Sequence, residues 1–221
     1  LAAKLPVYPP LAALEVSQDR LTEKKLFAKL GIRTAPYASV DSEQDLRDAV
    51  SQLGLPAILK TRRLGYDGKG QFVIRSEADI AAAWGTLGSA ALILEGFVKF
   101  SREVSIIAVR GQDGATAFYP LSENIHRDGI LFTSHARSDD AMQAYAEKFA
   151  SALLAELNYV GVLCLELFEV NGELVANEFA PRVHNSGHWT IEGSETSQFE
   201  NHLRAVMGLP LGETACVGFP A

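Results

Sequence analysis

Two apolar, strand-like runs joined by an Asn-Gly dipeptide constrain the fold of this chain more than any other stretch. Residues 162–170 are rich in Val and Leu, and a second such run follows Asn171-Gly172. Asn-Gly between two runs of this kind is a strong signal for a β-hairpin. Each run also carries a carboxylate, Glu166 or Glu178, which is costly to bury unless it is paired or binds a metal. We therefore predict a hairpin whose arms bring two functional carboxylates into one region.

The two carboxylates admit two interpretations. A strand glutamate on its own usually faces solvent. Two of them, followed at once by the basic and polar residues 182–188, favour a site for an oxyanion and for Mg2+, which takes one or two carboxylates and leaves its other positions to water and phosphate. A strict two-residue turn would pair Glu166 with Asn177 and place Glu178 on the opposite face. Sharing one metal therefore requires a three-residue turn, a bulge or a twist near the end of the hairpin.

Length and composition bound the class of protein. A chain of 221 residues, 48% hydrophobic and 21% charged, can bury a core as one large domain or two subdomains. Its net charge of -7 argues against non-specific nucleic-acid binding, which depends on clustered Lys and Arg. Local basic residues still allow a small anionic ligand. We expect a soluble globular protein without a nucleic-acid partner.

Cysteine usage and the apolar runs bear on the compartment. Cys164 and Cys216 form neither a disulfide framework nor a CxxC pair, which fits a cytoplasmic protein. No apolar run reaches the roughly 20 residues of a transmembrane helix, so no membrane partner is expected. Prolines near the N-terminus break any signal peptide. The first residue, Leu1, is not an initiator methionine, which suggests that the chain starts inside a longer protein.

A lysine-ended strand followed by a glycine-rich loop is the second feature of interest. The strand expected at 56–60 ends in Lys60, and residues 62–71 contain three glycines. Glycine lets backbone N–H groups approach phosphate oxygens, and Lys60 and Lys69 can supply charge. The spacing is neither that of a P-loop nor that of a Rossmann fingerprint, and the loop does not open a helix. An ordinary hairpin loop is the alternative interpretation.

Local signals predict the remaining helices. Helices are expected after the N-caps Asp19, Ser42 and Ser76, and over about 139–158 and 196–207. Residues 1–16 are expected to be an irregular lead-in. Of the basic residues on the first helix, Arg20, Lys24 and Lys25, most are expected on a solvated face.

These motifs together resemble those of ATP-grasp enzymes. The segments DRLTEKKLFAKLGI, GYDGKGQ, FSREVS, FYPLSENIHRDGI and NEFAPRVHNSGHWT are similar to the N5-carboxyaminoimidazole ribonucleotide synthetase family of purine biosynthesis. The resemblance covers nearly the whole chain. GYDGKGQ combined with PRVHNSGHWT separates this family from other ATP-grasp ligases, whereas EGFV or Lys60 alone would not.

The resemblance implies an α+β ATP-grasp fold, in which two α+β subdomains with largely antiparallel sheets and flanking helices clasp ATP. Residues 1–16 would lead in from a missing N-terminal Rossmann-like domain. Residues 17–98 would form the small lid subdomain with the glycine-rich loop, and 99–208 the large subdomain with the metal and bicarbonate site. Residues 209–221 would begin a truncated C-terminal domain.

The resemblance also assigns residues to the site. The implied ATP-binding residues are Arg20, Lys60, Gly65, Tyr66, Asp67, Gly68, Lys69, Gly70, Gln71, Glu95, Gly96, Phe97, Val98, Glu103, His126, Asn177 and Glu178. The implied catalytic residues are Arg182, His184, Asn185, Tyr66 and Asp67, and the implied Mg2+ ligands are Glu166 and Glu178. Glu95, Phe97 and Val98 would contact adenine, the last two through backbone groups, and Glu103 would accept from the ribose.

The implied reaction is the ATP- and bicarbonate-dependent carboxylation of 5-aminoimidazole ribonucleotide through carboxyphosphate, by a homodimeric enzyme that uses Mg2+. Arg182 would grip the planar anion, and His184 would orient it or accept a proton. Tyr66 and Asp67 would contact the amine substrate. The alternatives are another ATP-grasp carboxylating or formylating ligase, or an ATP-binding module without catalysis. The presence of Lys60 and Arg182 together with both glutamates argues against the module.

Overall fold

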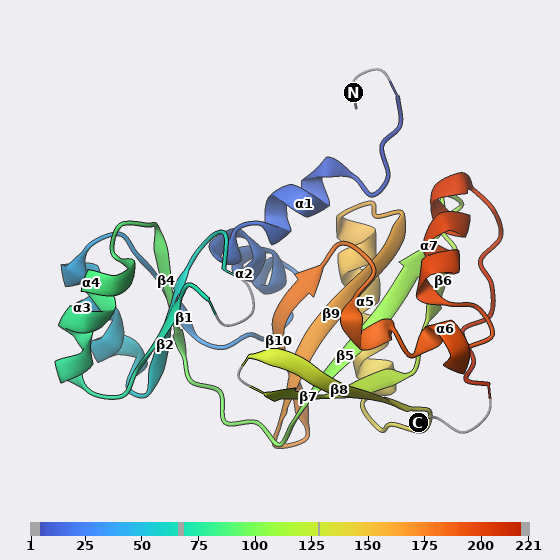
Figure 1. The fold of residues 1–221 in the computed structure, drawn as a ribbon. Helices are drawn as coiled ribbons and strands as arrows, with labels where there is room; N and C mark the ends of the chain where they lie inside the picture. The colour runs from blue at the N-terminus through green and yellow to red at the C-terminus, as the bar shows by residue number, and fades with distance from the viewer. Residues whose placement is uncertain (1–4, 66–68, 128, 218–221) are drawn as a thin grey trace.

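The computed structural model describes residues 5–65, 69–127 and 129–217. In Figure 1 a smaller sheet covered by helices lies on the left, and a larger sheet with its own helices lies on the right. The described helices are α1 (Leu11–Ser17), α2 (Arg20–Lys29), α3 (Glu43–Leu53), α4 (Ile80–Leu87), α5 (Gln143–Glu156), α6 (Thr190–Gly193) and α7 (Gln198–Met207), with short 3-10 turns η1 (Glu77–Asp79) and η2 (Asn185–Gly187). The described strands are β1 (Tyr37–Val40), β2 (Ala57–Thr61), β3 (Gln71–Ile74), β4 (Leu92–Gly96), β5 (Arg102–Arg110), β6 (Thr116–Phe118), β7 (Leu121–Arg127), β8 (Ile130–Arg137), β9 (Gly161–Val170) and β10 (Glu173–Ala180).

Both sheets are antiparallel between every pair of neighbouring strands. The smaller has the order β1-β4-β2-β3, and the larger has the order β10-β9-β5-β7-β8 with β6 paired to β5. Helices α3 and α4 cover the smaller sheet, and α5 covers one face of the larger. The predicted α+β class with antiparallel sheets and flanking helices is confirmed.

Helix ends follow the predicted caps. The Asp19 side chain accepts from the N–H groups of Leu21 and Thr22, and the Ser42 side chain accepts from Asp45. Each contact satisfies a backbone donor that the first turn of a helix leaves unpaired. The expectation of an irregular lead-in over residues 1–16 is wrong, because α1 begins at Leu11. Its first turn follows a proline, which suits a helix start, and the buried Ala13 packs into the core of the larger sheet.

The two faces of the larger sheet differ in chemistry because side chains alternate along each strand. On β5, Val104 and Ile106 belong to the apolar core that contains residues of α5. Glu103 and Ser105 point to the other face, where Ser105 lies opposite Glu166 of β9. A polar surface is thereby built onto one face of an otherwise buried strand pair.

Helix α2 connects the two sheets. Phe27 packs edge-on against Phe179 of β10, with ring centroids 6.1 Å apart. The expectation that most of the basic residues of this helix are solvated is wrong, because Lys25 is exposed but Arg20 is half-buried and Lys24 is only 1% exposed. Lys24 Nζ donates to the carbonyl oxygen of Asn177 at 2.8 Å and lies 3.6 Å from Glu95 Oε2 on β4. The limits proposed for the lid and large subdomains stay a prediction.

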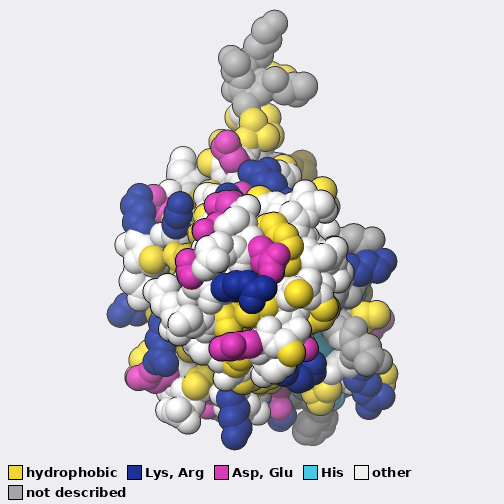
Figure 2. Space-filling model, turned by 90° about the vertical axis from the view of Figure 1, so that its left-hand side faces the viewer, with side chains coloured by type: hydrophobic (Ala, Val, Ile, Leu, Met, Phe, Trp, Pro, Cys, Tyr) yellow, Lys and Arg dark blue, Asp and Glu magenta, His cyan; other side chains and the backbone are white. Residues whose placement is uncertain are grey.

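The surface carries charges of both signs. Figure 2 shows Lys and Arg side chains interspersed with Asp and Glu side chains over the face on the side of α3 and α4.

Among the described residues, no helix combines the length and the apolar character needed to cross a bilayer. Cys164, on β9, is a buried free thiol.

The predicted β9–β10 hairpin has a two-residue turn. Val170 pairs with Glu173, and Asn171 and Gly172 have φ of 53° and 78°. Positive φ at both central residues is the geometry of a type I′ turn, whose twist matches that of the strands. The Asn-Gly dipeptide therefore sets the register of the turn end of the hairpin.

Replacing Gly172 by Ala should lower the free energy of unfolding by about 1–2 kcal/mol, because an L residue at this φ is strained. Gly85 in α4 is a matched control, since the added methyl group meets nothing within 4 Å at either position. Gly85→Ala should raise stability by about 0.5–1 kcal/mol. Urea unfolding of the two variants measures both shifts, and shifts of the same sign would contradict this account of the turn.

Candidate active site

A β-bulge brings the two predicted carboxylates together. The pairing of β10 with β9 shifts between Ala176 and Glu178, so that Asn177 is the extra residue and Glu178 lies opposite Glu166. One extra residue on one strand reverses the face that every later side chain occupies. The hairpin thus combines a two-residue turn at Asn171-Gly172 with a bulge at Asn177. Of the three arrangements that could bring both glutamates to one face, the structure has the bulge.

Each carboxylate already has a cationic or hydrogen-bonding partner. Arg20 Nη1 on α2 lies 2.6 Å from Glu178 Oε2, and His184 Nε2 lies 2.9 Å from Glu166 Oε1. Burial would raise the pKa of Glu178, but Arg20, with Lys60 and Lys24 nearby, lowers it. Burial opposes charge on His184, yet Cys164 and Glu166 together raise its pKa to about 10.

Lys60 belongs to a buried ionic cluster with Glu95. Lys60 Nζ donates to Glu95 Oε2 at 3.0 Å, and Lys24 Nζ lies 3.6 Å from the same oxygen. Burial alone would raise the pKa of Glu95, but the two lysines hold it below its usual value. Glu95 therefore stays ionised at the edge where the smaller sheet meets α2. An ionised carboxylate at this point can accept from an amino group.

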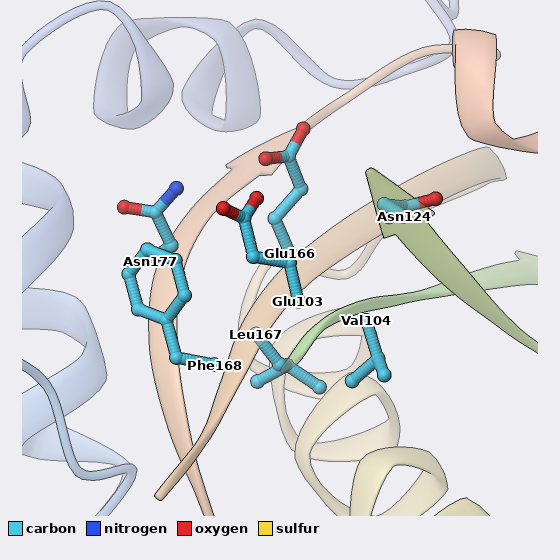
Figure 3. A pocket seen from close by; sticks show the side chains of 7 residues that line it. All are labelled: Glu103, Val104, Asn124, Glu166, Leu167, Phe168 and Asn177. Atoms are coloured by element: carbon cyan, nitrogen blue, oxygen red, sulfur yellow. The ribbon is translucent and has the colours of Figure 1, made fainter. Parts of the chain in front are cut away.

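A shallow pocket on the polar face of the larger sheet is lined by residues of four strands, β5, β7, β9 and β10. Figure 3 shows the carboxylates of Glu103 and Glu166 pointing to the same side, with Asn177 beside them and Asn124 across β5. His126 Nδ1 lies 2.6 Å from Glu103 Oε2. This contact raises the pKa of His126 against the opposing effect of burial.

A larger cleft of about 830 Å³ opens between α1, α2, the start of the glycine-rich loop and the end of β10. Glu178 and Gly65 line this cleft, together with four arginines: Arg20, Arg62, Arg63 and Arg182. The Arg182 side chain is exposed and donates to the Val183 carbonyl at 2.9 Å. Such a concentration of guanidinium groups suits a phosphate or carboxylate anion.

A model of the ATP-grasp domain matches residues 25–199 of the chain. The chain belongs to the ATP-grasp family. Its sequence is 59% identical over 218 residues to the N5-carboxyaminoimidazole ribonucleotide synthase of Pseudomonas aeruginosa, covering 99% of this chain and 61% of that protein.

The chain also superposes on solved structures of proteins with closely related names. The N5-carboxyaminoimidazole ribonucleotide synthetase of Thermus thermophilus superposes with a TM-score of 0.92 at 56% identity, covering 98% of this chain and 59% of that one. An N5-carboxyaminoimidazole synthase of Aspergillus clavatus, in complex with ADP and 5-aminoimidazole ribonucleotide, has a TM-score of 0.88 at 30% identity and covers 96% of this chain and 57% of that one. The chain thus spans 57–61% of the length of these three relatives. The ATP-grasp fold is confirmed.

The ATP-grasp domain brings many of the expected residues to two adjoining regions. Arg20, Gly65, Glu178 and Arg182 line the cleft, while Glu103, Glu166 and Asn177 line the pocket on the sheet. The two regions meet at the β9–β10 bulge. Tyr66, Asp67 and Gly68 lie outside the described residues, so their expected roles stay predictions.

One backbone group that was expected to contact the ligand already has a partner within the chain. The N–H of Phe97, expected to contact adenine, donates to the Pro56 carbonyl at 3.2 Å, while its side chain is exposed. Asn185 is also exposed at the start of η2. Lys69 and Gln71 follow the part of the glycine-rich loop that is not described.

Four residues near the site were missed by the sequence analysis: Glu23, Lys24, Arg62 and Arg63. Arg62 binds the Asp19 carboxylate through two hydrogen bonds, at 3.0 and 2.6 Å. Burial, reinforced by Glu178, raises the pKa of Glu23 to about 8. The paired arginines ahead of the glycine-rich loop were a visible signal, whereas nothing local distinguished Glu23 or Lys24 from ordinary surface residues of a helix.

Proposed function

We propose that the intact protein carboxylates 5-aminoimidazole ribonucleotide with ATP and bicarbonate, giving N5-carboxyaminoimidazole ribonucleotide for purine biosynthesis. The observation that carries this proposal is an arginine-lined cleft that adjoins two glutamates, Glu166 and Glu178, which a β-bulge places opposite each other in the strand pairing. The Aspergillus clavatus relative binds ADP and 5-aminoimidazole ribonucleotide, which supports the same ligands here. The family resemblance also supports a cytoplasmic homodimer.

Mg2+ is the cofactor that this donor set fits. Among the described residues, no three His, Cys, Asp or Glu side chains gather as a ready-made metal cluster. Glu166 and Glu178 nevertheless suit an ion that takes one or two carboxylates and completes its coordination with water and nucleotide phosphates. Bound there, Mg2+ would neutralise charge on the β- and γ-phosphate oxygens. The two glutamates are the residues that would hold it.

The chain's own side chains would position the reactants. In the first step a bicarbonate oxygen attacks the γ-phosphorus, the bond to the β-phosphate oxygen breaks, and ADP leaves with carboxyphosphate as the other product. Such phosphoryl transfer depends chiefly on positioning and on stabilising charge. Arg20, on α2, and Arg182, just after β10, both line the cleft. They can bind the γ-phosphoryl group that is transferred and the bicarbonate that accepts it. The amine nitrogen then attacks the carboxyl carbon, the bond from that carbon to the phosphate oxygen breaks, and inorganic phosphate leaves with the proton lost by the amine.

The decisive experiment measures ADP release by the intact protein with ATP, Mg2+ and 13C-bicarbonate, with and without 5-aminoimidazole ribonucleotide. Release that rises with the ribonucleotide, together with a 13C-carbamate product, is expected. Turnover only with a different amine or acid acceptor would indicate another ATP-grasp ligase. ATP binding without ADP release under any of these conditions would indicate a non-catalytic module.

Replacing Arg182 by Ala should lower bicarbonate-dependent ADP release by roughly ten- to a hundredfold, with little change in ATP affinity. A bidentate, charge-assisted contact is worth about 1.5–3 kcal/mol. Lys should restore little activity, because a point charge cannot reproduce the guanidinium fork. ATP titration and ADP release of both variants measure the two effects. Equal losses of affinity and turnover would move Arg182 into the nucleotide site, and no loss would make it an ordinary surface residue.

A further inference from the structure

A chain of buried hydroxyl groups lies behind His184. Ser186 Oγ is 2.9 Å from His184 Nδ1, and Ser105 Oγ is 2.7 Å from Ser186 Oγ. The Asn124 side-chain amide reaches Ser105 Oγ at 3.0 Å. Ser105 and Ser186 are 0% exposed, so no solvent competes for these contacts.

The imidazole is also held at its backbone. Gln198, buried at the start of α7, accepts from the His184 N–H at 2.9 Å and donates to the His184 carbonyl at 2.6 Å. The ring therefore projects from a fixed peptide, and its Nδ1 edge faces the backbone N–H of Ser186 at 3.3 Å as well as the hydroxyl. The remaining nitrogen, Nε2, points to Glu166.

We propose that Ser186 and Ser105 are positioning residues that hold His184 with its Nε2–H on Glu166, and through it fix the orientation of that carboxylate. A hydroxyl can donate to a neutral Nδ1 or accept from a protonated one, so the contact survives either charge state of the ring. Partners of this kind orient the groups that bind a metal and hold one tautomer in place. The consequence for turnover rests on the proposed function, whereas the geometry of the ring does not. In this arrangement His184 has no free lone pair facing the cleft, and it orients the site instead of accepting a proton.

The test compares wild type, Ser186→Ala, Ser105→Ala and the double variant. Ser122→Ala is the matched control, because Ser122 is an equally buried hydroxyl directly opposite Ser105 in the strand pairing but contacts Trp189 Nε1 instead of Ser186. Long-range 1H–15N spectra of the labelled protein report which imidazole nitrogen of His184 carries a proton. Wild type and Ser122→Ala should show a single set of imidazole resonances for His184, with a proton on Nε2. Ser186→Ala and Ser105→Ala should shift the Nδ1 resonance and give more than one set of resonances, because the ring is no longer held in one orientation.

Turnover supplies the second readout. Each serine variant should lower kcat by roughly ten- to a hundredfold with an unchanged KM for ATP, which is the usual cost of removing an outer-shell partner. The double variant should be no worse than the worse single variant, because the two hydroxyls act in series. Unchanged His184 resonances in both single variants would overturn the proposal, whatever the activity. If wild type shows no turnover, the proposed function fails while the spectra still decide the role of the serines. Should Ser186→Ala not fold, Ser105→Ala alone decides it.

Discussion

Glu178→Gln should reduce Mg2+-dependent turnover of the intact protein by about a hundredfold or more, equivalent to roughly 3 kcal/mol of transition-state stabilisation. Gln keeps the shape of the side chain but removes the charge that a hard cation prefers. The change also takes from Arg20 its 2.6 Å partner. Because the Glu178 side chain is 41% exposed, the fold should lose little stability. ADP release at increasing Mg2+ concentration and a thermal unfolding curve measure the two effects.

Glu173→Gln is the matched control for this variant. Glu173 lies on the same strand and also pairs with an arginine, Arg33, but both side chains are mostly exposed and neither lines the cleft. It should behave like wild type in both measurements. A Glu178→Gln protein that kept near-native activity would refute the metal assignment. Equal losses in the two variants would show that charge on β10 matters in general and that Glu178 has no special role.

Lys24→Met should destabilise the protein by about 3 kcal/mol, the lower end of the cost of breaking a buried ion pair, because Glu95 keeps Lys60 as a partner. For a chain of this size, that corresponds to a fall in Tm of roughly 6–12 °C. The variant also leaves the Asn177 carbonyl, the acceptor at the bulge, without its 2.8 Å donor. Loosening the bulge should weaken Mg2+-dependent turnover as well, because the bulge places Glu178 opposite Glu166.

Lys25→Met is the control, since Lys25 is the next residue of α2 and is exposed. Its Tm should change by less than about 2 °C, as expected for a surface substitution. Differential scanning calorimetry of the two variants gives the comparison directly. Closely similar Tm values for the two variants would mean that the Lys24 ammonium contributes nothing net to the fold, and the ionic link between α2, the smaller sheet and the bulge would have to be abandoned.

Local sequence was sufficient wherever the determining interaction spans only a few residues. Asp19 and Ser42 cap their helices through backbone groups two or three positions away. Asn171 and Gly172 set the turn because their own backbone angles do so. These features depend on steric and hydrogen-bonding preferences that act within one turn of chain. The Mg2+ and anion site inferred from the two carboxylates and the basic residues after them stays a prediction.

Tertiary structure decided what distant residues do to one another. The bulge at Asn177 has no local signature, and its carbonyl is satisfied by Lys24, 153 positions earlier in the chain. Lys24 itself resembles any other surface lysine until β4 and β10 enclose it. The contact between Ser105 and Ser186 spans 81 positions. Burial and charge pairing are properties of the assembled sheets, because desolvation depends on all the surfaces that meet at a point. The sequence therefore determined which groups were available for the site, and only packing determined which of them face one another.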